Sequence, residues 1–174
     1  MAFKRTHVEK WAATALPGET IVSYVLTTTF TPGGFGVVAG GAIVVHTNGP
    51  DVGDDRRVDL REQLGLDPEK RIDVRKTTNL LVLTNRRLVL ATRSARNRPK
   101  DIVHAGPAEK ARVHWFDHDA GSGTRLRHFI IEFGDGYWRT DRSGVTALGR
   151  TIKANNADGF VAALGSRAIE VSEG

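Results

Sequence analysis

The densest group of side chains that could do chemistry lies between His114 and Asp119, in the sequence His-Trp-Phe-Asp-His-Asp. Imidazole and carboxylate groups bind zinc, and two histidines four residues apart can share one metal when they lie on one helical face. The residues around them alternate between polar and apolar, which predicts a strand that leads into a loop. In a strand His114 and His118 would be roughly 13 Å apart. We therefore expect ordinary strand-end residues here, with no metal and no cofactor.

A catalytic nucleophile is not indicated either. The chain has no cysteine, which excludes disulfides and thiolate chemistry. Its serines lie outside any Gly-x-Ser-x-Gly pattern, the turn that exposes a nucleophilic serine in many hydrolases. Asp135 and Asp141 have a spacing that is typical of turns rather than of a catalytic carboxylate pair. The sequence thus predicts that the protein is not an enzyme.

Basic residues form the strongest candidate for a binding site. Residues 86 to 100 contain six basic side chains and no acidic one, and arginine can hold a phosphate through two hydrogen bonds. Arg86 and Arg87 fall at a predicted turn, roughly 17 to 20 Å from the others if the next strand has five or six residues. We interpret these two as structural. The candidate ligand- or membrane-binding residues are Arg93, Arg96, Arg98 and Lys100.

An uncharged run with five glycines covers Gly33 to His46. It is shorter than the roughly 20 residues that a membrane-spanning helix needs. A glycine-weakened strand is the favoured interpretation, followed by a loop that dips into a membrane or a partner with Phe35, Val37 and Val38. A phosphate-binding loop is disfavoured because no Gly-Lys-Ser/Thr follows. Since uncharged edge strands pair readily, residues 33 to 45 also suggest an alternative role in assembly of an oligomer or scaffold.

Charge and length limit the class of protein. The chain has 174 residues, a formal net charge of +5 and a pI near 9.9, which fits one domain that could bind an acidic partner. Nucleic acid is the disfavoured acidic partner, because the basic residues are not interleaved with aromatic ones. No apolar stretch typical of a secretory signal follows the charged N-terminus. We expect a cytoplasmic protein without a transmembrane segment, peripheral at the inner membrane face if it binds lipid.

Hydrophobic periodicity and turn residues predict the elements that position these side chains. A helix is expected over residues 3 to 15 and a strand over residues 19 to 29, with a polar insertion at 47 to 77 that contains one or two helical turns at 59 to 64. Residues 80 to 83 and 88 to 91 predict a hairpin with both faces covered, in which Asn85 takes a positive φ. Further strands are expected at 101 to 103, 112 to 117, 125 to 133 and 137 to 140.

The C-terminal part changes to a helical period. Val145, Leu148 and Ile152 would share one helical face, as would Phe160, Ala163 and Leu164. Asn155 and Asn156 are candidates for capping the second helix, and Gly165 would end it. Residues 166 to 174 are expected to be a flexible tail. The predicted organisation is thus a helix at 1 to 17, one domain at 18 to 165, and this tail.

The hairpin sequence Leu-Val-Leu-Thr-Asn-Arg-Arg-Leu-Val-Leu, residues 81 to 90, resembles a signature of the pleckstrin-homology-like (PH-like) superfold, in particular of its GRAM and bacterial PH-like families. The following Arg98-Pro99-Lys100-Asp101-Ile102 is similar to an element that comes next in those families. The resemblance covers residues 78 to 103 closely and residues 104 to 165 only in architecture.

This resemblance implies a mainly β (α+β) fold, a partly open antiparallel β-barrel with one end closed by the C-terminal helix. The sequence pattern predicts about seven strands for this barrel and adds a short N-terminal helix, to which the resemblance does not extend. It also implies a non-catalytic binding module for lipid headgroups or peptides. The leading hypothesis is therefore a module that docks on an anionic membrane surface or on a protein partner. A fold does not by itself imply a function.

Overall fold

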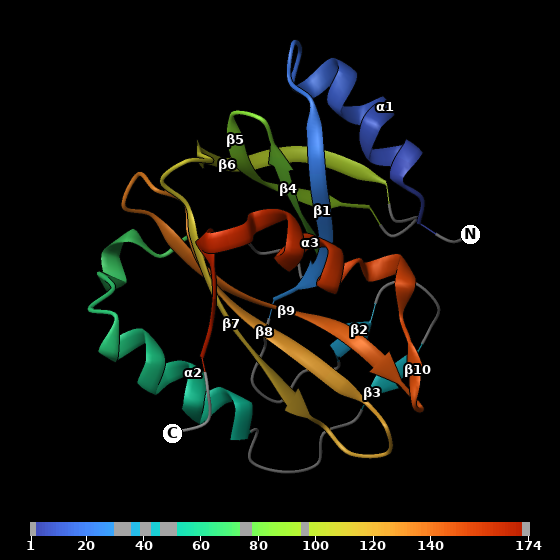
Figure 1. The fold of residues 1–174 in the computed structure, drawn as a ribbon, viewed down its shortest axis with the longest axis vertical. Helices are drawn as coiled ribbons and strands as arrows, with labels where there is room; N and C mark the ends of the chain where they lie inside the picture. The colour runs from blue at the N-terminus through green and yellow to red at the C-terminus, as the bar shows by residue number, and fades with distance from the viewer. Residues whose placement is uncertain are drawn as a thin grey trace.

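The computed structural model describes residues 3–29, 36–38, 43–45, 52–73, 78–94 and 98–171. These residues form a mainly β structure with nine strands in one mixed, open sheet, a separate two-stranded pair and three α-helices (Figure 1). The strands of the sheet are β1 (Ile21–Thr28), β4 (Thr78–Thr84), β5 (Arg87–Arg93), β6 (Pro99–Pro107), β7 (Arg112–Asp119), β8 (Arg125–Glu132), β9 (Trp138–Ala147), β10 (Arg150–Thr151) and β11 (Ala168–Glu170). The helices are α1 (Arg5–Ala15), α2 (Val52–Gln63) and α3 (Ala157–Leu164).

The strand order is β11-β7-β8-β9-β1-β4-β5-β6, and β10 pairs with β9. All of these pairings are antiparallel except that of β11 with β7. β1 joins two antiparallel meanders, β4 to β6 and β7 to β9, through a single residue pair with β9, Thr28 and Arg142. The other two strands, β2 (Gly36–Val38) and β3 (Ile43–Val45), pair with each other.

The predicted hairpin is confirmed as β4 and β5, with Leu83 opposite Leu88 across the turn. Its alternate side chains enter two separate cores, as expected for strands covered on both faces: Leu81 and Leu90 face one core, and Leu80 and Val89 face the other. Asn85, however, is not among the residues with positive φ. Its side chain instead accepts a hydrogen bond from the Thr20 backbone at 3.0 Å, which ties the turn to the start of β1.

Two of the three helices cover the hairpin from opposite sides. The predicted N-terminal helix is confirmed as α1, which buries Val8 and Ala12 in the same core as Leu80 and Val89. α3 buries Phe160 and Leu164 in the core that contains Leu81 and Leu90. Figure 1 shows α3 crossing the middle of the molecule and α1 above it.

The capping of α3 differs from the prediction. Asn156 occupies the N-cap position with φ 56° but makes no capping hydrogen bond with its side chain. The side-chain amide donates to the Tyr24 carbonyl at 2.7 Å and thereby joins the start of α3 to β1. Gly165 ends the helix with φ 58°, as expected for a glycine at this position.

α2 is longer than the one or two turns predicted. It packs against β7 and β8 on the face opposite to the core that contains α3. Leu60 lies in a small core with Phe116 and Ile130. A short 3₁₀ helix, Pro68–Lys70, follows, and the carbonyl of Asp67 accepts a hydrogen bond from the Trp138 indole at 2.6 Å. Part of the predicted polar insertion is therefore packed on the sheet. Figure 1 shows α2 at the lower left of the molecule, near the C-terminus.

Two predictions about the C-terminal part are wrong. Residues 145 to 152 do not form a helix, because β9 continues to Ala147 and turns back through Leu148 and Gly149 into β10. Residues 166 to 170 are not a frayed tail: a 3₁₀ helix, Gly165–Arg167, leads into β11, which pairs with β7. Hydrophobic spacing misled the first prediction because Val145, Leu148 and Ile152 fit a helical period by coincidence.

The far end of β6 comes close to the β8–β9 connection. A Cβ atom on Gly106 would lie 1.9 Å from the Phe133 carbonyl oxygen, so only glycine allows this approach. Next to it, the His104 Nε2 atom lies 2.7 Å from the Asp135 carboxylate, and the His104 ring packs edge-on against Phe133. β6, the strand at one end of the sheet order, therefore lies close to the β8–β9 connection.

Candidate anion-binding surface

Arg93 lies inside the fold rather than in the basic loop where the sequence placed it. It is the last residue of β5, and its side chain is 2% exposed. Its guanidinium donates to the carbonyls of Asn79 at 2.6 Å and of Thr27 at 3.2 Å. Burial lowers the pKa of Arg93 to about 10, and the charge of Asp141 acts in the opposite direction. These contacts make Arg93 a structural residue of the sheet.

Arg93 borders a buried polar network that joins β1, β4 and β9. The Asp141 carboxylate is fully buried and accepts hydrogen bonds from Arg139 Nε at 2.7 Å and from the Thr27 hydroxyl at 2.6 Å. Burial raises the pKa of Asp141, although Arg139 and Thr27 favour its charged form. Such an ion pair is retained because both partners are hydrogen-bonded, and loss of either one would leave a buried charge.

Two of the predicted binding residues, Arg98 and Lys100, are exposed at the start of β6. Arg98 lies in the β5–β6 connection, where its backbone amide donates to the Ser94 hydroxyl at 3.1 Å, and Lys100 is the second residue of β6. Arg96 and Phe35 lie outside the described residues. Val37 and Val38 are described only as backbone of β2. Of residues 33 to 45, to which the hypothesis of assembly refers, the structure describes only the backbone of β2 and β3, which pair with each other.

Two irregularities shape β6 around Lys100. Its pairing with β5 shifts register between the partners of Leu90 and Ala91, and again between those of Ala91 and Arg93. Four consecutive residues of this stretch, 100 to 103, are exposed, including Ile102 at 39% and Val103 at 37%. Bulges of this kind twist an edge strand away from regular pairing, so the start of β6 is a poor template for an added strand.

The indole of Trp11 lies against this strand from α1. Its N–H donates to the Lys100 carbonyl at 2.7 Å, and the side chain is half-buried. We define the β6 surface as Arg98, Lys100, Ile102, Val103 and Trp11. It combines two cationic side chains with three partly or fully exposed apolar ones, and Asp101 is the acidic residue within it.

Arg86 and Arg87 lie at the opposite end of the hairpin. Arg87 Nε donates to Glu19 at 2.8 Å, an ion pair that agrees with the interpretation of Arg87 as structural. Arg86 is exposed in the turn, and its carbonyl accepts a hydrogen bond from the backbone of Ala108 at 2.9 Å. Neither arginine belongs to the β6 surface.

The His-Asp group at 114 to 119 is distributed over both faces of β7. His114 Nε2 lies 2.9 Å from Glu132, and Asp117 accepts two hydrogen bonds from Arg127, at 2.7 and 2.9 Å. Arg127 also bonds Asp158 at 2.8 Å and covers the Trp115 ring. Within the described residues, no group of three or more histidine, aspartate or glutamate side chains is arranged to hold a metal ion.

His128 is the least expected polar residue of this region. It is fully buried on β8, stacks on Phe116 with ring centres 4.9 Å apart, and has no hydrogen-bond partner at either ring nitrogen. Burial, helped by the positive charges of Arg57 and Arg142, lowers the pKa of His128 to about 3. The neutral imidazole therefore acts as an aromatic packing residue beneath α2. Nothing in the sequence distinguishes it from a surface histidine.

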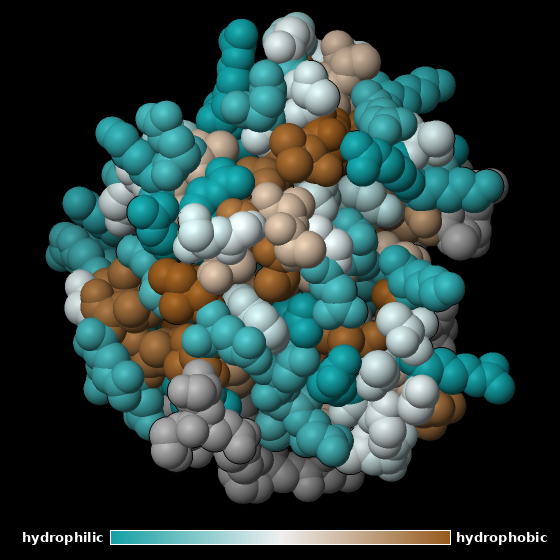
Figure 2. Space-filling view, viewed as in Figure 1, coloured by the Kyte–Doolittle hydropathy of each residue, from teal (hydrophilic) through white to brown (hydrophobic). Residues whose placement is uncertain are grey.

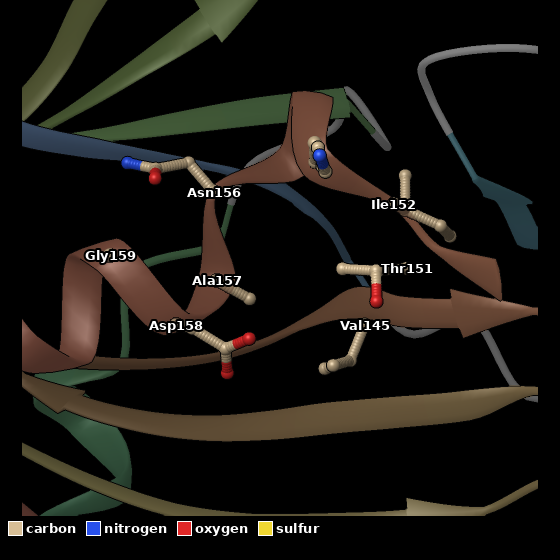
Figure 3. A pocket seen from close by; sticks show the side chains of 8 residues that line it. Val145, Thr151, Ile152, Asn156, Ala157, Asp158 and Gly159 are labelled. Carbon is tan, nitrogen blue, oxygen red and sulfur yellow. The ribbon is translucent and has the colours of Figure 1, made fainter.

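A cavity of about 220 Å³ lies between β9, β10 and the start of α3. Figure 3 shows Val145, Thr151, Ala157 and Asp158 pointing toward this space, whereas Asn156 points away. The carboxylate of Asp158 already accepts a hydrogen bond from Arg127 at the rim. The cavity offers one hydroxyl and mixed charge, which do not define a ligand class.

No protein-family model, no curated protein and no solved structure matches the chain. Any role of the β6 surface is therefore inferred from the chemistry of its own residues. Sequence reasoning identified Arg98 and Lys100 but missed the contributions of Trp11 and Ile102. The pattern offered a signal for Trp11, since a tryptophan at the edge of the apolar face of an amphipathic helix is available for contacts outside the core.

Proposed function

We propose that the protein is a non-catalytic binding module of the PH-like kind, which docks on an anionic membrane surface through the β6 surface. The fold-level support is the chain order of seven strands, β1 and β4 to β9, followed by α3. The approach of Gly106 to Phe133 is consistent with a partly closed barrel of these strands. The additions to that arrangement are the strands β2, β3, β10 and β11 and the helices α1 and α2.

The observation that carries the proposal is the composition of the β6 surface. Exposed cations at Arg98 and Lys100 are followed along the chain by exposed apolar side chains at Ile102 and Val103, and the Trp11 indole bonds the Lys100 carbonyl. Basic residues near an anionic leaflet each contribute about 1 kcal/mol, and tryptophan prefers the interface between water and acyl chains. The register shifts of β6 disfavour the alternative of a partner strand adding to this edge.

Membrane docking of this kind is peripheral. Among the described residues, no helix is long and apolar enough to cross a bilayer. We propose that the protein docks at the inner face of the cytoplasmic membrane and is held there by charge and shallow apolar contacts.

Vesicle sedimentation at several salt concentrations tests the proposal. We expect binding to phosphatidylcholine vesicles that contain about one third phosphatidylserine, at low ionic strength, and weaker binding at 0.5 M NaCl because salt screens the charges. Vesicles of phosphatidylcholine alone should bind far less. Equal binding to both vesicle types, or no binding to either at low salt, would contradict the proposal and leave a protein partner as the remaining hypothesis.

A further inference from the structure

A strained and exposed leucine marks the turn between β9 and β10. Ala147 pairs with Arg150, so Leu148 and Gly149 form a two-residue turn, with φ values of 49° and 74°. This is the geometry of a type I′ turn, in which asparagine or glycine normally takes the first position. A leucine is rare at a positive φ because its Cβ atom crowds the backbone.

Leu148 is also the most exposed large hydrophobic side chain among the described residues. It is 69% exposed, against 45% for Tyr137, the next in order. Figure 2 shows a hydrophobic area projecting at the right-hand edge of the molecule, over the β9–β10 turn. Leu148 therefore destabilises the free protein in two ways: its backbone is strained, and its apolar side chain is in contact with water. Strain of this kind is a reason to look for a function.

The neighbouring β7–β8 loop holds this turn in place. The Gly149 amide donates to the Gly123 carbonyl at 2.9 Å, and a Cβ on Gly123 would lie 2.6 Å from the Gly149 nitrogen. The Thr146 hydroxyl donates to the same carbonyl at 3.0 Å. The leucine is thus presented on a firm pair of turns in which its immediate neighbours are small or polar.

Cationic side chains surround the turn. Arg150 follows it directly, Lys153 comes three residues later, and Arg125 begins the adjacent strand; all three are exposed. Two acidic side chains lie in the same pair of strands and loops: Asp119, whose carboxylate accepts a hydrogen bond from the Gly121 amide at 2.8 Å, and Asp117, which lies 3.4 Å from Arg125 Nε. Arg125 is thus partly neutralised by Asp117, and Arg150 and Lys153 give the turn its positive charge, which complements anionic headgroups.

We propose that the β9–β10 turn is a second membrane contact, in which Leu148 enters the acyl layer while Arg125, Arg150 and Lys153 meet anionic headgroups. A single projecting side chain fits a fluid bilayer, which needs no shaped pocket, better than a protein interface, where an anchor is surrounded by a ring of further contacts. Figure 1 shows the turn on the right-hand side of the view, the side on which α1 begins. This inference rests on the proposed function.

Leu148→Asn separates a membrane anchor from a structural residue. Asparagine accepts the positive φ, so the variant should melt at the same or a higher temperature than the wild type. Its affinity for phosphatidylserine-containing vesicles should fall about tenfold, because the buried leucine surface is lost. Ile169→Thr is the control, since it removes an exposed apolar side chain from β11. Unchanged affinity in Leu148→Asn overturns this inference but not the proposed function, whereas absence of wild-type binding overturns both.

A fluorescent label gives an independent measurement. The chain has no cysteine, so Leu148→Cys and Ile169→Cys can each be labelled at one position with an environment-sensitive dye. On addition of the same vesicles, the label at position 148 should shift to shorter wavelength and the label at 169 should not. No shift at 148, or equal shifts at both positions, would overturn the inference.

Discussion

His128 illustrates how burial can decide the role of a titratable residue. Its ring is fully buried, stacks on Phe116 and makes no hydrogen bond. Because the pKa of His128 is about 3 in the folded state and 6.5 in the unfolded state, the unfolded chain binds the proton first as the pH falls. Titration of His128 has little effect on stability above pH 6.5 and destabilises the fold progressively between pH 6.5 and pH 3.

We predict that His128→Phe removes this part of the acid sensitivity. At pH 4.5 the wild-type histidine should cost about 2 to 3 kcal/mol relative to neutral pH, from about 1.4 kcal/mol per pH unit. Urea denaturation at pH 7.5 and pH 4.5 measures the difference, with His7→Gln on α1 as the control. If His128→Phe loses as much stability on acidification as the wild type, the buried histidine is not the cause.

Among the elements, the position of β6 depends on a single glycine, Gly106. Gly106 lets the strand approach the Phe133 carbonyl, and an added Cβ would lie 1.9 Å from that oxygen. We predict that Gly106→Ala lowers the free energy of unfolding by about 1 to 3 kcal/mol, as overpacking usually does. Val103→Ala, on the exposed part of the same strand, should change it by less than about 0.5 kcal/mol. A neutral Gly106→Ala in chemical denaturation would mean that β6 and the β8–β9 connection are not in firm contact.

Local sequence predicted some elements well, and the reason differs from one to the next. The β4–β5 hairpin was predictable because its two apolar runs flank a short polar turn, and α1 because Val8 and Ala12 repeat at helical spacing. The β9–β10 turn was missed because Leu-Gly is not a usual type I′ sequence, although β-branched residues lie on both sides of it. The pairing of β11 with β7 depends on a contact between distant parts of the chain, which no local pattern reveals.

The same distinction applies to the binding residues. Arg93 and Lys100 look equivalent in sequence, yet one ends a buried strand and the other begins an exposed one. The two residues differ in burial because β5 extends to Arg93, whereas Lys100 belongs to the exposed start of β6. The end of a strand depends on its pairing partners more than on its own residues. Trp11 reaches β6 only because α1 covers that sheet.

At the scale of the whole molecule, the β6 surface and the β9–β10 turn are proposed to serve one function, docking on a membrane. Both combine exposed apolar side chains with cations, and both are proposed to face the same anionic bilayer. A net charge of +5 would steer the protein toward such a surface from a distance, but the position of the charges should decide the orientation in which it docks. Position, rather than total charge, is therefore the quantity to measure.

The most direct test compares two variants that lose the same charge from different places. Arg98→Gln/Lys100→Gln removes the cations of the β6 surface, and Arg86→Gln/Lys110→Gln removes two exposed cations near the other end of the hairpin. Sedimentation with phosphatidylserine-containing vesicles at low salt should show at least a tenfold loss of affinity for the first variant, from about 1 kcal/mol for each lost cation. The second should lose less than threefold. Equal losses would show that only net charge matters and would contradict docking through the β6 surface.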